Sequence, residues 1–303
     1  MSGAAVAVIG PTASGKSLVA LAAAQEVRGT ELVSIDAMQV YRGMDIGTAK
    51  PSLAEQALVP HHLIDLVEPS EDYTVARFQD DYRAARAAIV ARGGAALLVG
   101  GTGLYLTAAI DDLDVPGQYP EVRLALDALP TAELHRRLAE ADPLAATRME
   151  ATNRRRVLRA LEVTVGSGRP FSSYGPGVSA FPPSPVVQIG LRWSRDALTA
   201  RIDRRVRAML AAGWLEEVRA LTAGPNPMSR TAGQALGYRE LIDHLAGRST
   251  LDEAADLIVL HTRQFAVRQE RWFRRDPRIR WHDIDADERE AIPAVVAALH
   301  ELP

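Results

Sequence analysis

The residues with the clearest chemistry form a glycine-rich loop near the start of the chain. Residues 10–17, GPTASGKS, fit the pattern G-x-x-x-x-G-K-[ST] in full. In such loops backbone N–H groups turn toward an anion, the lysine reaches the outer phosphate, and the hydroxyl stands where it would ligate Mg²⁺. The helix expected after the loop adds the positive end of its dipole. The predicted diphosphate- or nucleotide-binding residues are Gly10, Pro11, Thr12, Ala13, Ser14, Gly15, Lys16 and Ser17, with Ser17 as the Mg²⁺ ligand.

Lysine is rare in this chain, which makes its place in the loop informative. Of 35 lysine and arginine residues, only Lys16 and Lys50 are lysines. An ammonium is a compact point charge, whereas a guanidinium is a planar fork. Because arginine stands nearly everywhere else, a lysine in the phosphate loop indicates a specific need for the ammonium.

A carboxylate, Asp36, ends the predicted second strand, 31–36. Ligands of open α/β sheets bind at the carboxyl ends of the strands, next to the phosphate loop. A carboxylate there can take a proton from an attacking group while the loop holds a phosphorylated leaving group, which suits both phosphoryl transfer and diphosphate displacement. The alternative is an aspartate that only caps a strand–loop turn.

A second glycine turn follows the predicted fourth strand. The stretch LLVGGTGLYL, 97–106, repeats the order strand, turn, helix, with Thr102 at the turn. Its glycines allow a backbone to approach a ligand closely, although a plain strand–helix turn has the same pattern. No clear Walker-B strand follows, since HLID, 62–65, is a poor match. The sequence therefore argues against a nucleotide-driven motor or a GTPase.

The elements that must position these residues alternate along the chain. Buried-type strands are expected at 6–10, 31–36, 62–67, 96–101, 186–193 and 278–284. Helical patterns lie between them at 17–27, 76–93 and 195–213. Alternation of this kind predicts an α/β fold of the P-loop NTPase-like type, a mainly parallel sheet flanked by helices.

The middle of the chain differs, because 113–175 has no convincing strand. It contains helical patterns at 132–142 and 153–168. Loops rich in proline and glycine, 115–120 and 175–185, flank it. We predict a helical insertion domain, and the predicted organisation is a first core segment at 1–112, the insertion at 113–184 and a second core segment at 185–303.

The second core segment carries a long, basic helical pattern at 252–275. Ile258, Phe265 and Trp272 fall seven residues apart on one of its faces. An apolar stripe with this spacing favours core packing over a ligand site.

The net charge of −3 hides two arginine-rich stretches. Residues 148–159 hold five arginines and one acid, and 263–280 hold seven arginines and two acids. Such stretches indicate local contact with a polyanion, or two ordinary solvated helix faces. The chain has no cysteine, which excludes disulfides and thiolate metal sites. With no apolar run of membrane-spanning length and no leader before the loop, we expect no membrane association and a cytoplasmic location.

Together these segments resemble the bacterial tRNA dimethylallyltransferase family, also named tRNA isopentenyltransferases. The specific matches are MDIGTAKP, 44–51, and GGTGLY, 100–105, and RRVLRALEV, ALGYREL and TRQFAVRQERWFR match as well. The resemblance implies transfer of a dimethylallyl group from dimethylallyl diphosphate to the N6 amine of the adenine just 3′ of the anticodon. It implies Mg²⁺ as cofactor, the tRNA anticodon stem-loop as partner and, we expect, a monomer. Whether ATP also binds the loop stays open.

The resemblance also implies roles for single residues. Asp36 matches the general base, Thr102 a position at the catalytic channel, and Arg201 an arginine that assists the leaving diphosphate, with Arg205 as an alternative. Gln39 matches a base-recognition segment. The expected tRNA-binding residues are Asp36, Ala37, Met38, Gln39, Thr102, Arg123, Arg155, Arg156, Arg159, Gln234, Gly237, Arg239, Arg268 and Arg271.

Three other functions fit part of the pattern. An isopentenyltransferase acting on a free adenine nucleotide shares the loop and the aspartate, but needs neither an insertion nor a basic helix. A small-molecule kinase would leave about a third of the chain without a purpose. A non-catalytic RNA-binding protein would not need Lys16, Ser17 and Asp36 together. The chain also departs from some members in two places: it has no zinc finger, which the eukaryotic members add, and Gln234 stands where some relatives carry arginine.

Overall fold

The computed structural model describes residues 4–175 and 177–302. Residues 1–3, Pro176 of the predicted 175–185 loop and Pro303 lie outside this description. The chain divides into two compact units, one formed by Met1–Asp111 with Phe181–Pro303, the other by Asp112–Ala180.

The larger unit is built on a parallel sheet of six strands in the order β3-β2-β4-β1-β5-β6, which confirms the predicted α/β fold. The central strand β1 pairs with β4 on one side and β5 on the other. The strands are β1 Ala5–Ile9, β2 Thr30–Ser34, β3 His61–His62, β4 Ala95–Gly100, β5 Val186–Trp193 and β6 Ile279–Ile284.

The third strand is much shorter than the predicted strand 62–67. Only His61–His62 pairs with β2, and farther along Val67 forms an isolated bridge with Tyr41. Leu63 and Asp65 have φ values of 62° and 53°, in the left-handed region that an extended strand cannot use. The apolar alternation of this segment therefore reflects burial of a loop.

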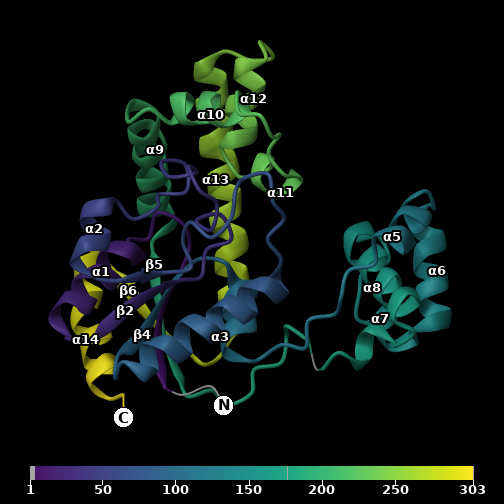
Figure 1. Cartoon of the computed structure of the whole chain (residues 1–303), viewed down its shortest axis with the longest axis horizontal. Helices are drawn as coiled ribbons and strands as arrows, with labels where there is room; N and C mark the ends of the chain where they lie inside the picture. Colours follow the sequence, from purple (N-terminus) through teal and green to yellow (C-terminus); the bar gives the residue numbers. More distant parts are fainter. Residues whose placement is uncertain (1–3, 176, 303) are drawn as a thin grey trace. The chain divides into compact units, whose positions relative to one another are not determined.

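Helices cover both faces of the sheet (Figure 1). One face packs against α1 and α14, and the other against a larger core to which α3, α4, α9 and α13 contribute. The helices of this unit are α1 Lys16–Glu26, α2 Leu53–Leu58, α3 Val75–Ala91, α4 Gly103–Ile110, α9 Arg195–Ala211, α10 Trp214–Thr222, α11 Arg230–Gly233, α12 Tyr238–Leu245, α13 Leu251–Phe273 and α14 Ile292–His300.

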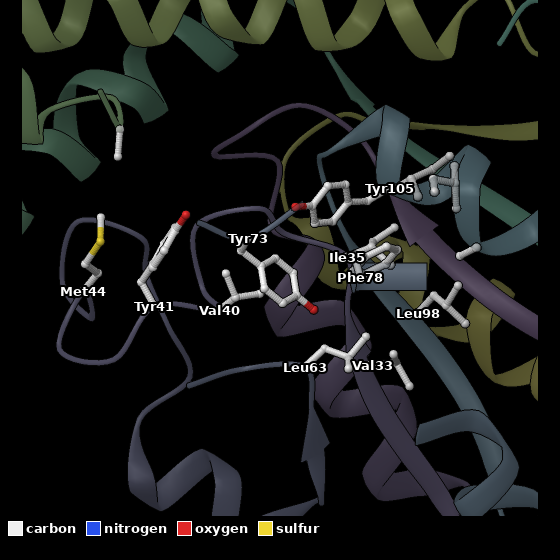
Figure 2. Packing of buried hydrophobic residues seen from close by; sticks show 14 of the residues in the cluster. Val33, Ile35, Val40, Tyr41, Met44, Leu63, Tyr73, Phe78, Leu98 and Tyr105 are labelled. Atoms are coloured by element: carbon white, nitrogen blue, oxygen red, sulfur yellow. The ribbon is translucent and has the colours of Figure 1, made fainter. Parts of the chain in front are cut away.

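The larger core shows how the strands direct alternate residues to opposite faces. Val33 and Leu98 point into it (Figure 2), while their neighbours Leu32 and Leu97 face the α1–α14 side. Against these residues Phe78 of α3 stacks on Tyr105 of α4, with ring centroids 4.1 Å apart. This packing fixes α4, and with it the glycine turn that precedes α4.

In the long helix α13, the predicted apolar stripe is only partly buried. Ile258 is fully buried and Trp272 is partly buried, as core packing requires. Phe265, however, is 36% exposed, and the guanidinium of Arg268 lies 5.8 Å from its ring centroid. The stripe is thus core at its two ends and surface in the middle.

The smaller unit is helical, and its described residues contain no strand. It consists of α5 Pro120–Asp127, α6 Thr131–Ala141, α7 Pro143–Thr147, α8 Arg154–Ser167 and a short 3-10 turn, Phe171–Ser173. Leucine and valine side chains of α6 and α8 form its own core. The sequence placed the limits of this insertion at 113 and 184, and the units divide after Asp111 and before Phe181.

Candidate active site

The phosphate loop joins β1 to α1 at the carboxyl edge of the sheet. Gly10 and Gly15 have φ values of 147° and 88°, which only glycine adopts without strain. A Cβ atom on Gly10 would also lie 2.7 Å from the carbonyl oxygen of Leu191. The buried hydroxyl of Ser14 has no hydrogen-bond partner within 4–175 and 177–302. An unpaired buried hydroxyl at this position supports an anion-binding role for the loop.

Lys16 begins α1, and its ammonium donates to the carbonyl oxygen of Pro11 over 2.6 Å. Burial and, second to it, the charge of Arg205 lower the pKa of Lys16 from 10.5 to about 7, against an opposing effect of Asp36. No carboxylate of the described residues forms an ion pair with this ammonium. A phosphate group would supply the missing negative charge.

Asp36 follows β2 at the same edge of the sheet. Its Oδ1 accepts a hydrogen bond from the N–H of Met38 over 2.8 Å, so the capping role is real. Its Oδ2 has no hydrogen-bond partner in the described part of the chain. The charge of Asp36 raises the pKa of both Lys16 and Arg205, so both cations lie within range of this carboxylate. Asp36 can therefore cap the turn with one oxygen and accept a proton on the other.

Thr102 connects the second glycine turn to the Asp36 loop. Its Oγ1 accepts a hydrogen bond from the N–H of Ala37 over 3.2 Å. Its N–H donates to the carbonyl oxygen of Ile35 over 3.4 Å. Thr102 thus stands directly beside Asp36, as the sequence motif predicted for a residue of the same site.

Gln39 is committed to the structure of its own loop. Its amide donates to the carbonyl oxygens of Thr48 and Ala49 over 3.3 and 3.1 Å, and it accepts from the hydroxyl of Ser34 over 2.8 Å. These contacts hold the segment MDIGTAKP against β2. The expected role of Gln39 in base recognition stays a prediction. In the structure its side chain stabilises the loop 44–51.

Arg201, the arginine predicted to assist the diphosphate, supports the loop from behind. Its Nε donates to the carbonyl oxygen of Ala13 over 2.8 Å, and it pairs with Glu288 over 2.9 Å. Its guanidinium also lies 4.2 Å from the ring centroid of Trp193. Because these three partners occupy the guanidinium of Arg201, few of its N–H groups remain to bind a ligand.

Arg205, one turn later on α9, is the better placed of the two arginines. Its guanidinium has no hydrogen bond or ion pair to the residues that the structure describes. Burial lowers the pKa of Arg205, while the charge of Asp36 raises it. A partly buried arginine whose charge acts on Lys16, without a carboxylate in contact among the described residues, favours Arg205 as the diphosphate ligand.

The arginines predicted to bind tRNA, together with Gln234, fall into two groups. Arg155, Arg156, Arg268, Arg271 and Arg239 are exposed, as is Gln234, and no ion pair engages these five guanidinium groups within the described chain. Arg123 and Arg159 instead pair with Glu162, over 3.0 and 2.7 Å, although that carboxylate is only 3% exposed. The first group is available to a polyanion, while the second stabilises the helical unit.

Gly237 is buried, in contrast to the other predicted tRNA contacts. Its φ is 89°, and a Cβ atom there would overlap the ring of Trp214. Packing against this tryptophan is sufficient to explain the glycine in the motif ALGYREL.

Sequence reasoning missed the residues that support the loop from other elements. Gln269 of α13 accepts from the N–H of Thr12 over 2.8 Å, and the indole N–H of Trp193 donates to the carbonyl oxygen of Ser14 over 3.0 Å. Glu288 holds Arg201. These residues lie more than 170 positions from the loop. No local pattern could have connected them to it.

Comparison with known proteins adds to this geometry. The model of a family described as IPP transferase matches residues 39–276. The chain belongs to this family. A tRNA dimethylallyltransferase of Kineococcus radiotolerans is 51% identical over 285 residues, 91% of this chain and 89% of the relative. A tRNA dimethylallyltransferase of Streptomyces avermitilis is 46% identical and covers 98% of this chain, with 96% of that protein matched.

Two solved structures are similar over almost the whole chain. The tRNA isopentenylpyrophosphate transferase of Bacillus halodurans has a TM-score of 0.70 at 37% identity, covering 98% of this chain and 97% of that one. The structure of a eukaryotic dimethylallyltransferase acting on tRNA has a TM-score of 0.79 at 26% identity. The match covers 93% of this chain and 74% of that chain. The membership agrees with the resemblance seen in the sequence motifs.

Proposed function

We propose that this family member transfers a dimethylallyl group from dimethylallyl diphosphate to the N6 amine of the adenine just 3′ of the tRNA anticodon. The relatives named above carry the name tRNA dimethylallyltransferase. The observation that supports the chemistry most directly is that the charges of Lys16, Arg205 and Asp36 act on one another near the carboxyl edge of the sheet. Two cations suit a diphosphate leaving group, and a carboxylate with a free oxygen suits a base.

The reaction divides between two walls of this site. At the phosphate loop, backbone N–H groups, Lys16 and Arg205 take up the negative charge that grows on the diphosphate as its bond to C1 of the allyl group breaks. The adenine N6 forms its bond to C1, whose developing positive charge is delocalised over the allyl system. At the Asp36–Thr102 wall, Asp36 Oδ2 accepts the proton that N6 loses, while Oδ1 stays on the N–H of Met38.

We propose Mg²⁺ as the cofactor. No group of three or more histidine, aspartate or glutamate side chains that could hold a metal occurs among the described residues. The exposed hydroxyl of Ser17, in the first turn of α1, fits a cation that takes its other ligands from diphosphate oxygens and water. A bound Mg²⁺ would supply further neutralisation of the leaving group.

The tRNA substrate is supported by the exposed arginines. A target adenine must leave its stack for its N6 to reach Asp36. Arg155 and Arg156 on α8, with Arg268 and Arg271 on α13, offer guanidinium groups to phosphates or unstacked bases. A free adenine nucleotide would need neither surface, which weighs against that alternative.

No described helix is long and apolar enough to cross a bilayer.

One experiment tests the proposal as a whole. The protein is incubated with unmodified tRNA, Mg²⁺ and either dimethylallyl diphosphate or ATP, and the nucleosides are analysed by mass spectrometry. We expect dimethylallyl adenosine with dimethylallyl diphosphate alone, and none without Mg²⁺. Phosphate on the acceptor, with a strict need for ATP, would instead identify a kinase. AMP in place of tRNA tests the free-nucleotide alternative, and light scattering and cell fractionation test the predicted monomer and cytoplasmic location.

A further inference from the structure

Helix α13 presses two side chains onto the glycine turn that carries Thr102. A Cβ atom on Gly101 would overlap the amide nitrogen of Gln269, and one on Gly103 would overlap the ring of Trp272. Gln269 and Trp272 are three residues apart, so they lie on one face of the helix. The glycines therefore serve a close contact with α13 and not only a ligand.

Gln269 uses its side-chain amide to join this turn to the phosphate loop. Its Oε1 accepts from the N–H of Thr12 over 2.8 Å, and its Nε2 donates to the carbonyl oxygen of Gly101 over 2.8 Å. The residue is only 7% exposed. A buried amide that bonds two backbone segments fixes their separation, since each bond lost leaves an unpaired buried group.

The connection continues to the base. Thr102 follows Gly101 directly, and its Oγ1 holds the N–H of Ala37, the neighbour of Asp36. One path of hydrogen bonds thus runs from Thr12 through Gln269 and the glycine turn to the Asp36 loop. Its two ends are the wall that holds the leaving group and the wall that takes the proton.

We propose that Gln269 is a positioning residue that sets the distance between the phosphate loop and the Asp36–Thr102 wall. The inference rests on the proposed function, because the distance matters only if donor and acceptor react between the two walls. Reacting atoms must come within about 3–3.5 Å, and a misplacement of 1 Å can cost roughly 100-fold in rate. Gln269 would act through the backbone of both walls, because its amide bonds the N–H of Thr12 and the carbonyl oxygen of Gly101.

A neutral amide makes both bonds at once, because it carries one acceptor and one donor whatever the pH near neutrality. Methionine fills a similar volume but makes neither bond. An ionised glutamate can accept from Thr12 but cannot donate to Gly101, whereas a protonated glutamate can do both. Because burial raises the pKa of a carboxyl group, Gln269→Glu should regain its missing donor as the pH falls.

The test compares Gln269→Met, Gln269→Glu and the control Gln188→Met in the full chain. Gln188 is also a buried glutamine, 1% exposed in β5, and its amide atoms have no partner among the described residues. With tRNA and dimethylallyl diphosphate we expect Gln269→Met to lower kcat by roughly 10- to 100-fold, with either KM changed less than about threefold. Gln188→Met should keep the wild-type kcat. For Gln269→Glu, the ratio of its kcat to that of wild type should rise between pH 8 and pH 6.

The outcomes separate this inference from the proposed function. A wild type without transferase activity would reject the function itself. If wild type is active and folded Gln269→Met has the same kcat, the positioning role is rejected. It is also rejected if Gln188→Met loses as much kcat as Gln269→Met. If Gln269→Met does not fold, Gln269→Glu decides: a ratio to wild type that is flat with pH overturns the proposal.

Discussion

Lys16 of the phosphate loop lies within range of the charge of Arg205 on α9. Burial and the charge of Arg205 together lower the pKa of Lys16 from 10.5 to about 7, and Asp36 only partly opposes them. Concentrated positive charge of this kind is unfavourable in the free protein. It becomes favourable once an anion binds, so the site is arranged for its ligand and not for the stability of the empty loop.

The first prediction is that diphosphate binding takes up a proton. With a pKa of about 7, Lys16 is mostly neutral at pH 8 and mostly charged at pH 6 in the free protein. A bound anion raises the pKa of Lys16, because it favours the charged form. Titration calorimetry with pyrophosphate, in buffers of different ionisation enthalpy, should show that wild type takes up more protons than Lys16→Met, by up to about one at pH 8 and by little at pH 6. The variant subtracts the ionisation of pyrophosphate itself. An equal difference at both pH values would contradict the lowered pKa of Lys16.

The second prediction concerns Asp36. Asp36→Asn keeps an oxygen that can accept from the N–H of Met38, so the turn and the melting temperature should be preserved. It removes the base, and kcat should fall by roughly 10²- to 10⁴-fold while tRNA affinity is kept. Single-turnover rates provide the measurement. A near-normal rate would leave Asp36 with the capping role alone.

The third prediction separates the two arginines of α9. Arg205→Met should weaken pyrophosphate binding and lower kcat by roughly 10²- to 10³-fold, with a melting temperature at or above that of wild type, because a desolvated cation is removed. Arg201→Met should lower the melting temperature, since it leaves partly buried Glu288 and the carbonyl oxygen of Ala13 without their partner. The reverse assignment of these effects would restore Arg201 as the diphosphate ligand.

The fourth prediction divides the arginines assigned to tRNA. Arg155→Ala and Arg268→Ala should weaken tRNA binding and reduce its salt slope by roughly one unit each, with stability changed by less than about 0.5 kcal/mol. The sequence placed Arg159 in the same class, but its bonds to Glu162 and to the carbonyl oxygens of Pro116 and Gly117 predict a lower melting temperature for Arg159→Ala. Binding measured against salt, with thermal unfolding of each variant, distinguishes them. Unchanged affinity and slope in the first two variants would make those arginines ordinary solvated groups.

The sequence predicted those features whose residues are close together along the chain. The phosphate loop needs glycines, a lysine and a hydroxyl within eight residues, and the strand before it and the helix after it have their own periodic patterns. Predicted strand 186–193 and helix 195–213 fall within two residues of β5 and α9. Predicted strand 62–67 fails because Leu63 and Asp65 adopt left-handed backbone inside a buried loop, where apolar residues do not imply a strand.

The tertiary structure decided which long-range partner each side chain has. Arg201 and Arg205 are one turn apart on a single helix, and no local pattern distinguishes them. Folding brings Ala13 and Glu288 to Arg201 and leaves Arg205 beside Lys16 and Asp36. In the same way Gln269 is one glutamine of a helical pattern until the sheet brings Thr12 and Gly101 to its amide. Sequence patterns report periodicity and local bonding, whereas hydrogen bonds and ion pairs between distant residues arise only when the core packs the elements together.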